Sequence, residues 1–181
     1  MEPLTTERLV LRPWRETDRG GFETLARDER VIRYIGDGSA WSAERIADVF
    51  GRQLRHWGEH GFGWYAVSTA VDDRWIGFAG LNHVGPEATE VEDHEVEIGW
   101  WLDPAAWGQG FATEAAVAAR DDAFGRAALR RIIGRHRPEN RASATIMRKL
   151  GMTFETDAVG RHGVIVRIHA LSREEWVRLP R

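Results

Sequence analysis

Cysteine is absent from this sequence of 181 residues, and no long apolar run, basic cluster or low-complexity linker is present. Without cysteine, the chain can form no disulfide, no thiolate metal site and no covalent cysteine intermediate. No stretch approaches the roughly 18 consecutive apolar residues that a membrane-spanning helix needs. The opening residues lack the basic and then apolar pattern of a secretory signal. These absences predict a cytoplasmic enzyme or binding module without membrane contact.

The charge of the chain argues against a nucleic-acid partner. Its formal net charge is -3, and its 25 basic residues are scattered instead of gathered into a patch that would follow phosphates. An apolar fraction of 43% beside 29% charged residues is typical of a globular chain. Because no repeat or Pro/Gly/Ser-rich linker divides the sequence, we expect a single domain over residues 1–181.

Hydrophobic periodicity divides the chain into strand-like and helix-like segments. Strands are predicted at residues 7–14, 64–69, 75–81, 91–102, 130–136, 152–157 and 163–171. Helices are predicted at residues 18–28, 42–57, about 113–126 and 142–150, with Ser42 capping the second. Strands that cluster in mid-chain and then alternate with helices indicate an α+β fold, an α/β sandwich. We expect a mixed, mostly antiparallel twisted sheet of about seven strands flanked by helices.

The most informative segment is EVEIGWWLDPAAWGQGFATEA, residues 95–115. An apolar strand stops at Asp103-Pro104, and a loop containing Gly108 and Gly110 then runs directly into a helix. Glycines allow close approach to the backbone, and the unpaired amides and positive dipole of a helix start suit a pyrophosphate. A tight turn before an ordinary helix is the alternative interpretation. The GxGxxG order of dinucleotide-binding folds and the GK[ST] of a P-loop are both absent.

The segment WGQGFATEA resembles the acetyl-CoA loop of the GNAT superfamily, and its leading tryptophan is typical of the RimJ/RimL-like branch, the ribosomal-protein N-acetyltransferases. Other segments resemble landmarks of that branch in the same order. TERLVLRPWRETD is similar to its first strand, VEIGWWLDP to its fourth strand and PENRASATIMRKLGM to its cofactor-side helix. HALSREEW is similar to its C-terminus, so the likeness extends over nearly the whole chain.

The resemblance implies direct attack of a neutral amine on the thioester of acetyl-CoA, with no covalent enzyme intermediate. The first expected acceptor is the α-amine of a protein or peptide N-terminus. The alternatives are a small-molecule amine such as a polyamine, amino acid or antibiotic, and a non-catalytic acyl-CoA-binding module. Homodimers are common in this branch. The cofactor contacts implied by the resemblance are Trp100, Trp101, Leu102, Trp107, Gly108, Gln109, Gly110, Phe111, Ala112, Thr113, Asn140, Ser143 and Met147.

Two residues are expected to carry the chemistry. Glu97 stands where family members often have an acidic residue, so it is the expected base, acting through water, with Glu95 as second choice. The alternative is that Glu97 is only a polar residue on a half-exposed strand. Many GNAT enzymes place a proton-donating tyrosine where this chain has Met147, which cannot donate. The resemblance assigns that role to Ser143, whose alternative is an ordinary place in the first turn of a helix.

Two positions in the predicted cofactor site have structural alternatives. Gly99 would permit a bulge, which in this family separates the fourth strand from the fifth and frees backbone groups for the pantetheine arm. Asn140 is expected either to contact that arm or only to cap the helix that follows.

The remaining signals concern the acceptor and metals. Segments that line the acceptor groove in relatives hold Tyr34, Trp41, Trp64 and His83, which are weak candidates for substrate contact. His56 and His60 are four apart on a predicted helix, but the run is HWGEH and Gly58 weakens the helix between them. We therefore expect no metal site. An acidic stretch at 87–95 is expected to attract a cationic acceptor or, more simply, to be solvated.

Overall fold

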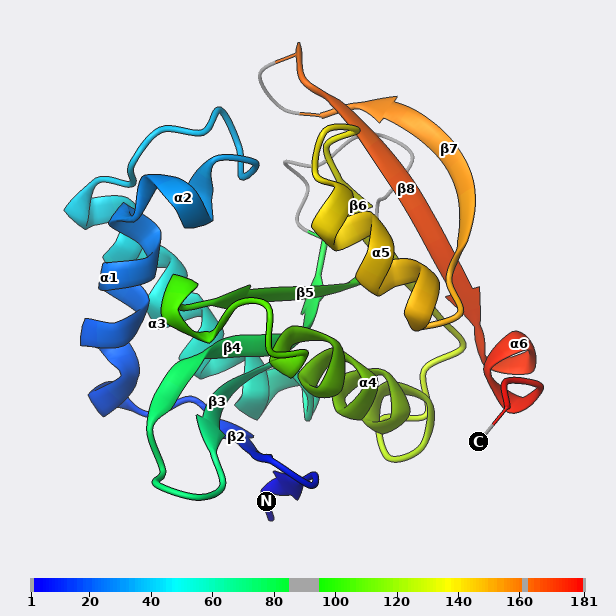
Figure 1. Ribbon diagram of the computed structural model, residues 1–181, viewed down its shortest axis with the longest axis horizontal. Coiled ribbons are helices and arrows are strands. Elements are labelled where there is room, and N and C mark those ends of the chain that lie inside the picture. The colour runs from blue at the N-terminus through cyan, green and yellow to red at the C-terminus, as the bar shows by residue number, and fades with distance from the viewer. Residues whose placement is uncertain (1, 85–94, 161–162, 181) are drawn as a thin grey trace.

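The computed structural model describes residues 2–84, 95–160 and 163–180, which build one eight-stranded sheet with helices on both faces (Figure 1). The strand order is β1-β2-β3-β4-β5-β6-β8-β7, and every described pair is antiparallel except β5 with β6. The strands are β1 (Leu4–Thr5), β2 (Leu9–Pro13), β3 (Trp64–Thr69), β4 (Trp75–His83), β5 (Val96–Leu102), β6 (Arg131–His136), β7 (Thr153–Val159) and β8 (Ile165–Ser172). The helices are α1 (Arg19–Arg27), α2 (Glu29–Ile32), α3 (Ala43–His60), α4 (Phe111–Phe124), α5 (Arg141–Lys149) and α6 (Arg173–Val177), with 3-10 turns η1 (Glu16–Asp18) and η3 (Pro104–Ala106).

The predicted α+β class with a mixed, mostly antiparallel sheet is confirmed. The sheet has eight strands instead of about seven, because the two-residue β1 is too short to show a pattern. The short helices α2 and α6 were likewise not predicted. Most of the acidic stretch, and the first part of the strand expected at 91–102, lie outside the described residues.

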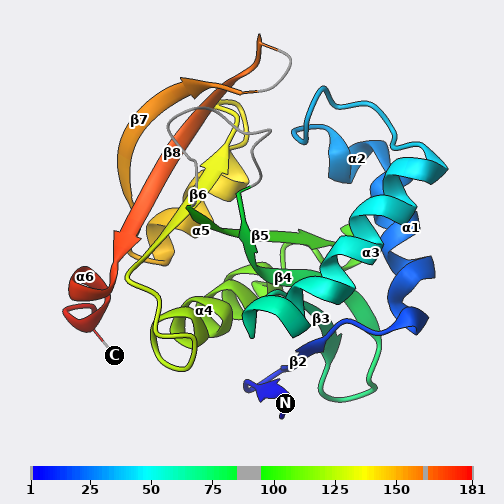
Figure 2. The same ribbon diagram turned by 180° about the vertical axis from the view of Figure 1, so that it is seen from behind.

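The two faces of the sheet are covered by different kinds of side chain. On the face in front in Figure 1, α4 packs through its buried alanines, which bring the helix close to β4 and β5. The opposite face, turned forward in Figure 2, carries α1 and α3 over an aromatic cluster that includes Trp14, Phe22, Phe50 and Phe78. Within the described ranges, no helix combines the length and apolar character needed to cross a membrane.

A buried polar network fixes α4 to the sheet. Asp122 on α4 is 6% exposed and accepts a hydrogen bond of 2.8 Å from the Tyr65 hydroxyl on β3. The Arg126 guanidinium donates two bonds of 2.6 Å to the same carboxylate and one of 2.7 Å to the Gly61 carbonyl. Burial, followed by the hydrogen bond to Asp122, raises the pKa of Tyr65. The network therefore holds α4, and with it the loop at its N-terminal end, in a defined position.

Candidate functional site

A cleft of about 1230 Å³ opens at the N-terminal end of α4. Four segments line it: α2 with the loop that follows it, the end of β5, the loop between β5 and α4 with the first turn of α4, and one side of α5. The volume exceeds the roughly 300–1,000 Å³ typical of a pocket for one small ligand. The cleft therefore has room for two reactants side by side.

The loop before α4 offers backbone donors to this cleft. Gly108 and Gly110 have φ angles of +75° and +84°, a conformation that glycine adopts without strain. The amide of Trp107 bonds to the Pro104 carbonyl, but the amides of residues 108–113 have no partner within the described chain. The first amides of a helix point along its axis and carry a partial positive charge, so this end of the cleft suits a diphosphate.

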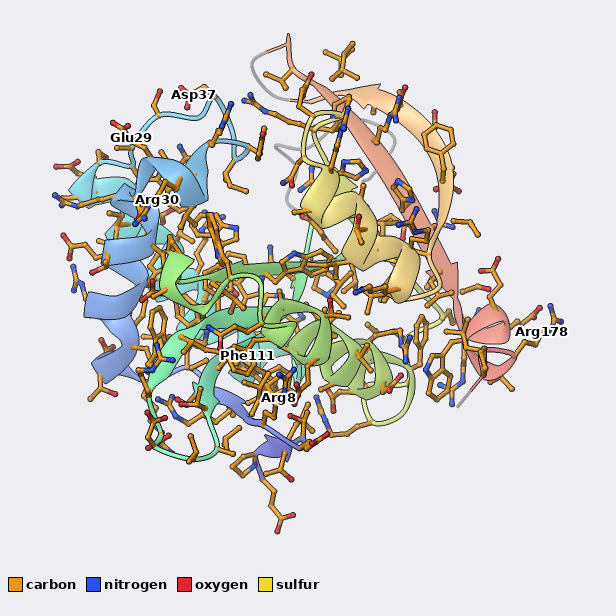
Figure 3. All side chains as sticks on the ribbon, in the orientation of Figure 1. Arg8, Glu29, Arg30, Asp37, Phe111 and Arg178 are labelled. Carbon is orange, nitrogen blue, oxygen red and sulfur yellow. The ribbon has the colours of Figure 1, made fainter. Side chains whose placement is uncertain are left out.

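Side chains pin this loop at both ends. The indole Nε1 of Trp107 donates to the Leu102 carbonyl at 2.8 Å, which ties the loop to the end of β5. The Arg8 guanidinium donates to the Gln109 carbonyl at 2.9 Å and lies over the Phe111 ring, 4.7 Å from its centroid. Figure 3 shows Arg8 and Phe111 near each other at the start of α4.

Glu114, in the first turn of α4, completes this anchor. Its carboxylate accepts hydrogen bonds from the Thr6 hydroxyl at 2.6 Å, the Arg8 backbone amide at 3.0 Å and the Arg8 Nε at 2.7 Å. Burial raises the pKa of Glu114, but the hydrogen bonds from Thr6 and Arg8 outweigh it and leave the pKa lowered. Because the partners are more than 100 residues apart in sequence, local pattern gave no signal for this contact.

Strands β5 and β6 separate beside the cleft. β5 pairs with β4 over its whole length, whereas the only β5–β6 pair among the described residues is Glu97 with Ile133. The register with β4 is unbroken at Gly99, opposite Gly80, so the bulge predicted at Gly99 is not present. The split comes from the divergence of β6 instead. Trp100, Trp101 and Leu102, beyond the split, line the cleft as expected for an arm-binding strand.

The structure places Glu97 at the point of divergence but not in the lining of the cleft. Its carboxylate forms an ion pair of 2.6 Å with Arg135 of β6, and its side chain is 24% exposed. Glu95 is similarly paired with Arg131 at 3.0 Å. Both candidate bases are therefore engaged with guanidinium groups across the two strands.

The start of α5 faces the cleft. The Asn140 side chain caps the helix, because its Oδ1 accepts from the Ser143 amide at 3.1 Å. Both residues line the cleft, and the Ser143 hydroxyl has no hydrogen-bond partner in the described part of the chain. Met147 is 1% exposed and packs in the core against β6, so it lies behind the lining. The cap and a contact with a ligand are compatible for Asn140, since its Nδ2 stays available.

Most of the other predicted contacts reach the cleft. Its lining includes Trp107, Gly108, Gly110, Phe111, Ala112, Thr113 and Tyr34, but not Gln109. The structure does not bring the other three acceptor candidates there. Trp41 packs edge-on against Trp101 at 5.1 Å, Trp64 stacks on Phe78 at 4.4 Å, and His83 lies beside His56 in a separate hollow.

Sequence reasoning missed the charged wall opposite the loop. The cleft is lined on this side by charged residues from α2 and the loop after it: Glu29, Arg30, Arg33 and Asp37. Figure 3 labels Glu29, Arg30 and Asp37 there. Arg137 donates to the Gly36 carbonyl and so connects this wall to the loop before α5. Surface charges on a four-residue helix and its loop have no distinguishing pattern in sequence.

This architecture matches that of known proteins. A family model described as an acetyltransferase (GNAT) domain matches residues 8–153. The uncharacterized N-acetyltransferase YnaD of Bacillus subtilis (strain 168) is 30% identical over 153 residues, 84% of this chain and 83% of its own length. The crystal structure of an acetyltransferase from Agrobacterium tumefaciens str. C58 superposes with a TM-score of 0.81 at 30% identity, covering 94% of each chain.

More distant structures share the fold. RimL, a ribosomal L7/L12 α-N-protein acetyltransferase in complex with coenzyme A, has a TM-score of 0.76 at 19% identity over 94% of this chain and 98% of its own. Spermidine N-acetyltransferase from Vibrio cholerae, in complex with CoA and spermine, has a TM-score of 0.75 at 17% identity over 96% and 100%. Proteins with two kinds of acceptor thus share this architecture.

Proposed function

Because the chain belongs to the GNAT acetyltransferase family, and is an acetyl-CoA-dependent N-acetyltransferase, we propose that it acetylates a primary amine held in this cleft. The proposed first acceptor class is the α-amine of a peptide or protein N-terminus, as in the RimJ/RimL-like branch that the sequence resembles. The observation that carries the proposal is one continuous cleft that joins unpaired loop amides, a parting of the sheet and a charged wall.

Acetyl-CoA supplies the activated acetyl thioester. We assign its diphosphate to the amides of residues 108–113, because these donors are unpaired and Gly108 leaves open space beside them. The arm is assigned to the β5 edge at Trp100, Trp101 and Leu102, where β6 has diverged. Asn140, the N-cap residue of α5, lines the same cleft, and its Nδ2 is the proposed donor to the arm. Gln109 and Met147 would support this site from outside the lining.

The acceptor amine has to lose a proton, since an α-amine with a pKa of about 7.7–8.0 is mostly protonated at neutral pH. Glu97 is the proposed proton acceptor through water, because it is a partly exposed carboxylate at the point where β5 and β6 part. Ser143 is the proposed donor to the departing thiolate, because its hydroxyl lines the cleft without another partner. On the opposite wall, Glu29 and Asp37 would attract the cationic form of the amine, whereas Arg30 and Arg33 beside them would oppose it.

An acceptor screen tests the reaction and its substrate class together. Calorimetry with acetyl-CoA first measures cofactor binding, and thiol release is then followed with N-terminal peptides, polyamines, amino acids and aminoglycosides. We expect thiol release with peptides that carry a free N-terminus and none with the same peptides after N-terminal blocking. Preference for polyamines would move the proposal to small-molecule amines. Binding without thiol release from any amine would indicate a non-catalytic acyl-CoA-binding module.

A matched pair of variants tests Glu97. Glu97→Gln removes the carboxylate, whereas Arg135→Gln removes the ion-pair partner and keeps the carboxylate. As a base, Glu97 predicts a loss of kcat in Glu97→Gln of about 10²-fold or more, greatest at low pH, where amine deprotonation is hardest. Arg135→Gln should retain most of its turnover and the shape of its pH profile. An equal loss of kcat in both variants, with an unchanged pH profile, would mean that the Glu97–Arg135 ion pair only holds β5 and β6 together.

A further inference from the structure

Three histidines from separate parts of the chain meet on the face opposite α4. His56 and His60 come from the last turns of α3, and His83 ends β4. Each ring offers one nitrogen as a ligand atom, and these three nitrogens all lie within 4.8 Å of one another. The ring centroids are 4.4 Å apart for His56 and His60 and 4.6 Å apart for His60 and His83. The helix continues through Gly58 to His60, so the spacing of four places both rings on one side.

The tautomer of His56 suits a metal ligand. Its Nδ1 is 2.8 Å from the Phe62 carbonyl, and since a carbonyl only accepts, Nδ1 carries the proton. Its Nε2 therefore presents a lone pair, which accepts only a long bond of 3.3 Å from the backbone amide of His83. A backbone carbonyl that holds the Nδ1 proton is the usual outer partner of a metal-binding histidine.

We propose that His56, His60 and His83 bind one divalent transition-metal ion of the zinc type, with water in the fourth position. Imidazole nitrogens are favoured ligands of Zn²⁺, Ni²⁺ and Cu²⁺. Tetrahedral zinc with Zn–N bonds of 2.0–2.1 Å requires nitrogens about 3.4 Å apart, so the rings have to close by about 1.5 Å at most. His60 makes this closure feasible, because its side chain is 37% exposed on the helix surface.

The charges around the rings set the expected affinity. Glu59 lines the adjoining hollow, and its carboxylate is 3.8 Å from the Nε2 of His60, which favours a cation. Arg52 and Arg55 line the same hollow and oppose a cation. We therefore expect a Kd of micromolar order, weaker than a closed structural zinc site. The metal would join the C-terminal end of α3 to the end of β4, and no described residue lines both this hollow and the cleft.

Calorimetric titration of the tag-free, chelator-dialysed full chain with ZnCl2 tests the site. The expected result is one Zn²⁺ per chain, with an affinity reduced at least tenfold in His60→Gln and in His83→Gln. His169→Gln is the matched control, because His169 belongs to a separate pair with His136 on β6 and should leave the affinity unchanged. Both His60 and His83 are partly exposed, so these variants should remain folded, which circular dichroism in the absence of metal verifies.

A second measurement distinguishes a specific site from loose adsorption. Co²⁺ bound by three imidazoles in a tetrahedral site gives visible d–d absorption, which should vanish in both ligand variants and persist in His169→Gln. The proposal is overturned if the wild-type chain takes up no Zn²⁺ at submillimolar concentration, or if His60→Gln and His83→Gln bind it as well as the wild type does. Neither readout depends on acetyl transfer.

Discussion

At the scale of single residues, the two hydroxyls on the cleft side of α5 differ in their bonding. The Ser143 hydroxyl has no partner in the described chain, whereas the Thr145 hydroxyl donates to the Arg141 carbonyl at 2.9 Å. Only the first is available to pass a proton to a leaving thiolate. We expect Ser143→Ala to lower kcat about 10²-fold at neutral pH while the acetyl-CoA affinity measured by calorimetry stays within about twofold.

Thr145→Ala is the control for this substitution, because it removes a hydroxyl from the same helix and the same cleft wall. Its kcat should stay close to that of the wild type. Equal turnover in the wild type and Ser143→Ala would remove Ser143 from the mechanism. Equal losses in both variants would trace the effect to the helix surface instead of one proton donor.

Gly110 is a second position where we expect the addition of a side chain to change cofactor binding. Its φ of +84° is costly for any other residue by about 1–2 kcal/mol, and an added Cβ would come within 3.3 Å of the Arg8 guanidinium. Gly110→Val should therefore displace the loop and reduce acetyl-CoA affinity at least tenfold in calorimetry. Gly20→Ala is the control, since Gly20 lies in α1 with open space around it, and it should leave cofactor affinity unchanged. If Gly110→Val bound acetyl-CoA with wild-type affinity, the assignment of this loop to the cofactor would be wrong.

At the scale of elements, the contact of the β1–β2 segment with α4 has a defined pH dependence. The pKa of Glu114 is lowered from its ordinary 4.5, so its bonds stabilise the fold fully above pH 4.5 and are lost as the pH falls below it. We expect Glu114→Gln to reduce the free energy of unfolding by about 1 kcal/mol at pH 7, allowing for the solvent exposure of Arg8. The difference should shrink towards zero below pH 4.

Urea unfolding of both proteins between pH 3 and pH 7 measures this effect. Glu23→Gln is a suitable control, because Glu23 makes only an exposed i,i+4 pair with Arg27, worth less than about 0.5 kcal/mol. A constant difference between wild type and Glu114→Gln across the pH range would show that the charge of Glu114 contributes nothing to the contact.

The same elements show what sequence can and cannot predict. The strand at Trp64–Thr69, bounded by turn signals, and the capped, amphipathic run at Ala43–His60 were predicted closely, because each pattern is local. The glycine loop was placed for the same reason. Arg8 with Glu114, Glu97 with Arg135 and His83 with His56 were not predicted, because each pair joins residues at least 27 positions apart. The predicted bulge at Gly99 was wrong, because divergence of a whole strand separates β5 from β6 without a local irregularity.

At the scale of the whole molecule, the strand order explains where the cleft lies. β8 is inserted between β6 and β7, and β6 runs parallel to β5. The C-terminal strands β6, β7 and β8 therefore form a second wing, whose hydrogen-bonded ladder with the N-terminal wing, β1 to β5, is a single residue pair among the described residues. Figure 1 shows these strands rising away from β4 and β5. The glycine loop and the cleft-lining end of β5 belong to the N-terminal wing, whereas α5 packs on β6 of the C-terminal wing as well as on α4. A ligand in the cleft would therefore contact both wings.

This arrangement predicts that cofactor binding stabilises the whole chain. Acetyl-CoA at 100 times its Kd should add about 2.7 kcal/mol to the free energy of unfolding, provided that the unfolded chain does not bind it. For a chain of this size, the shift corresponds to a rise in Tm of about 5–10 °C, which differential scanning fluorimetry can measure. Desulfo-CoA should give nearly the same rise and pantetheine alone much less, because the diphosphate is assigned to the loop amides. With a Kd at least tenfold higher, Gly110→Val should gain no more than about 1.4 kcal/mol, half of the wild-type effect, at the same concentration. A full rise in Tm in that variant would mean that the ligand bridges the two wings without the loop.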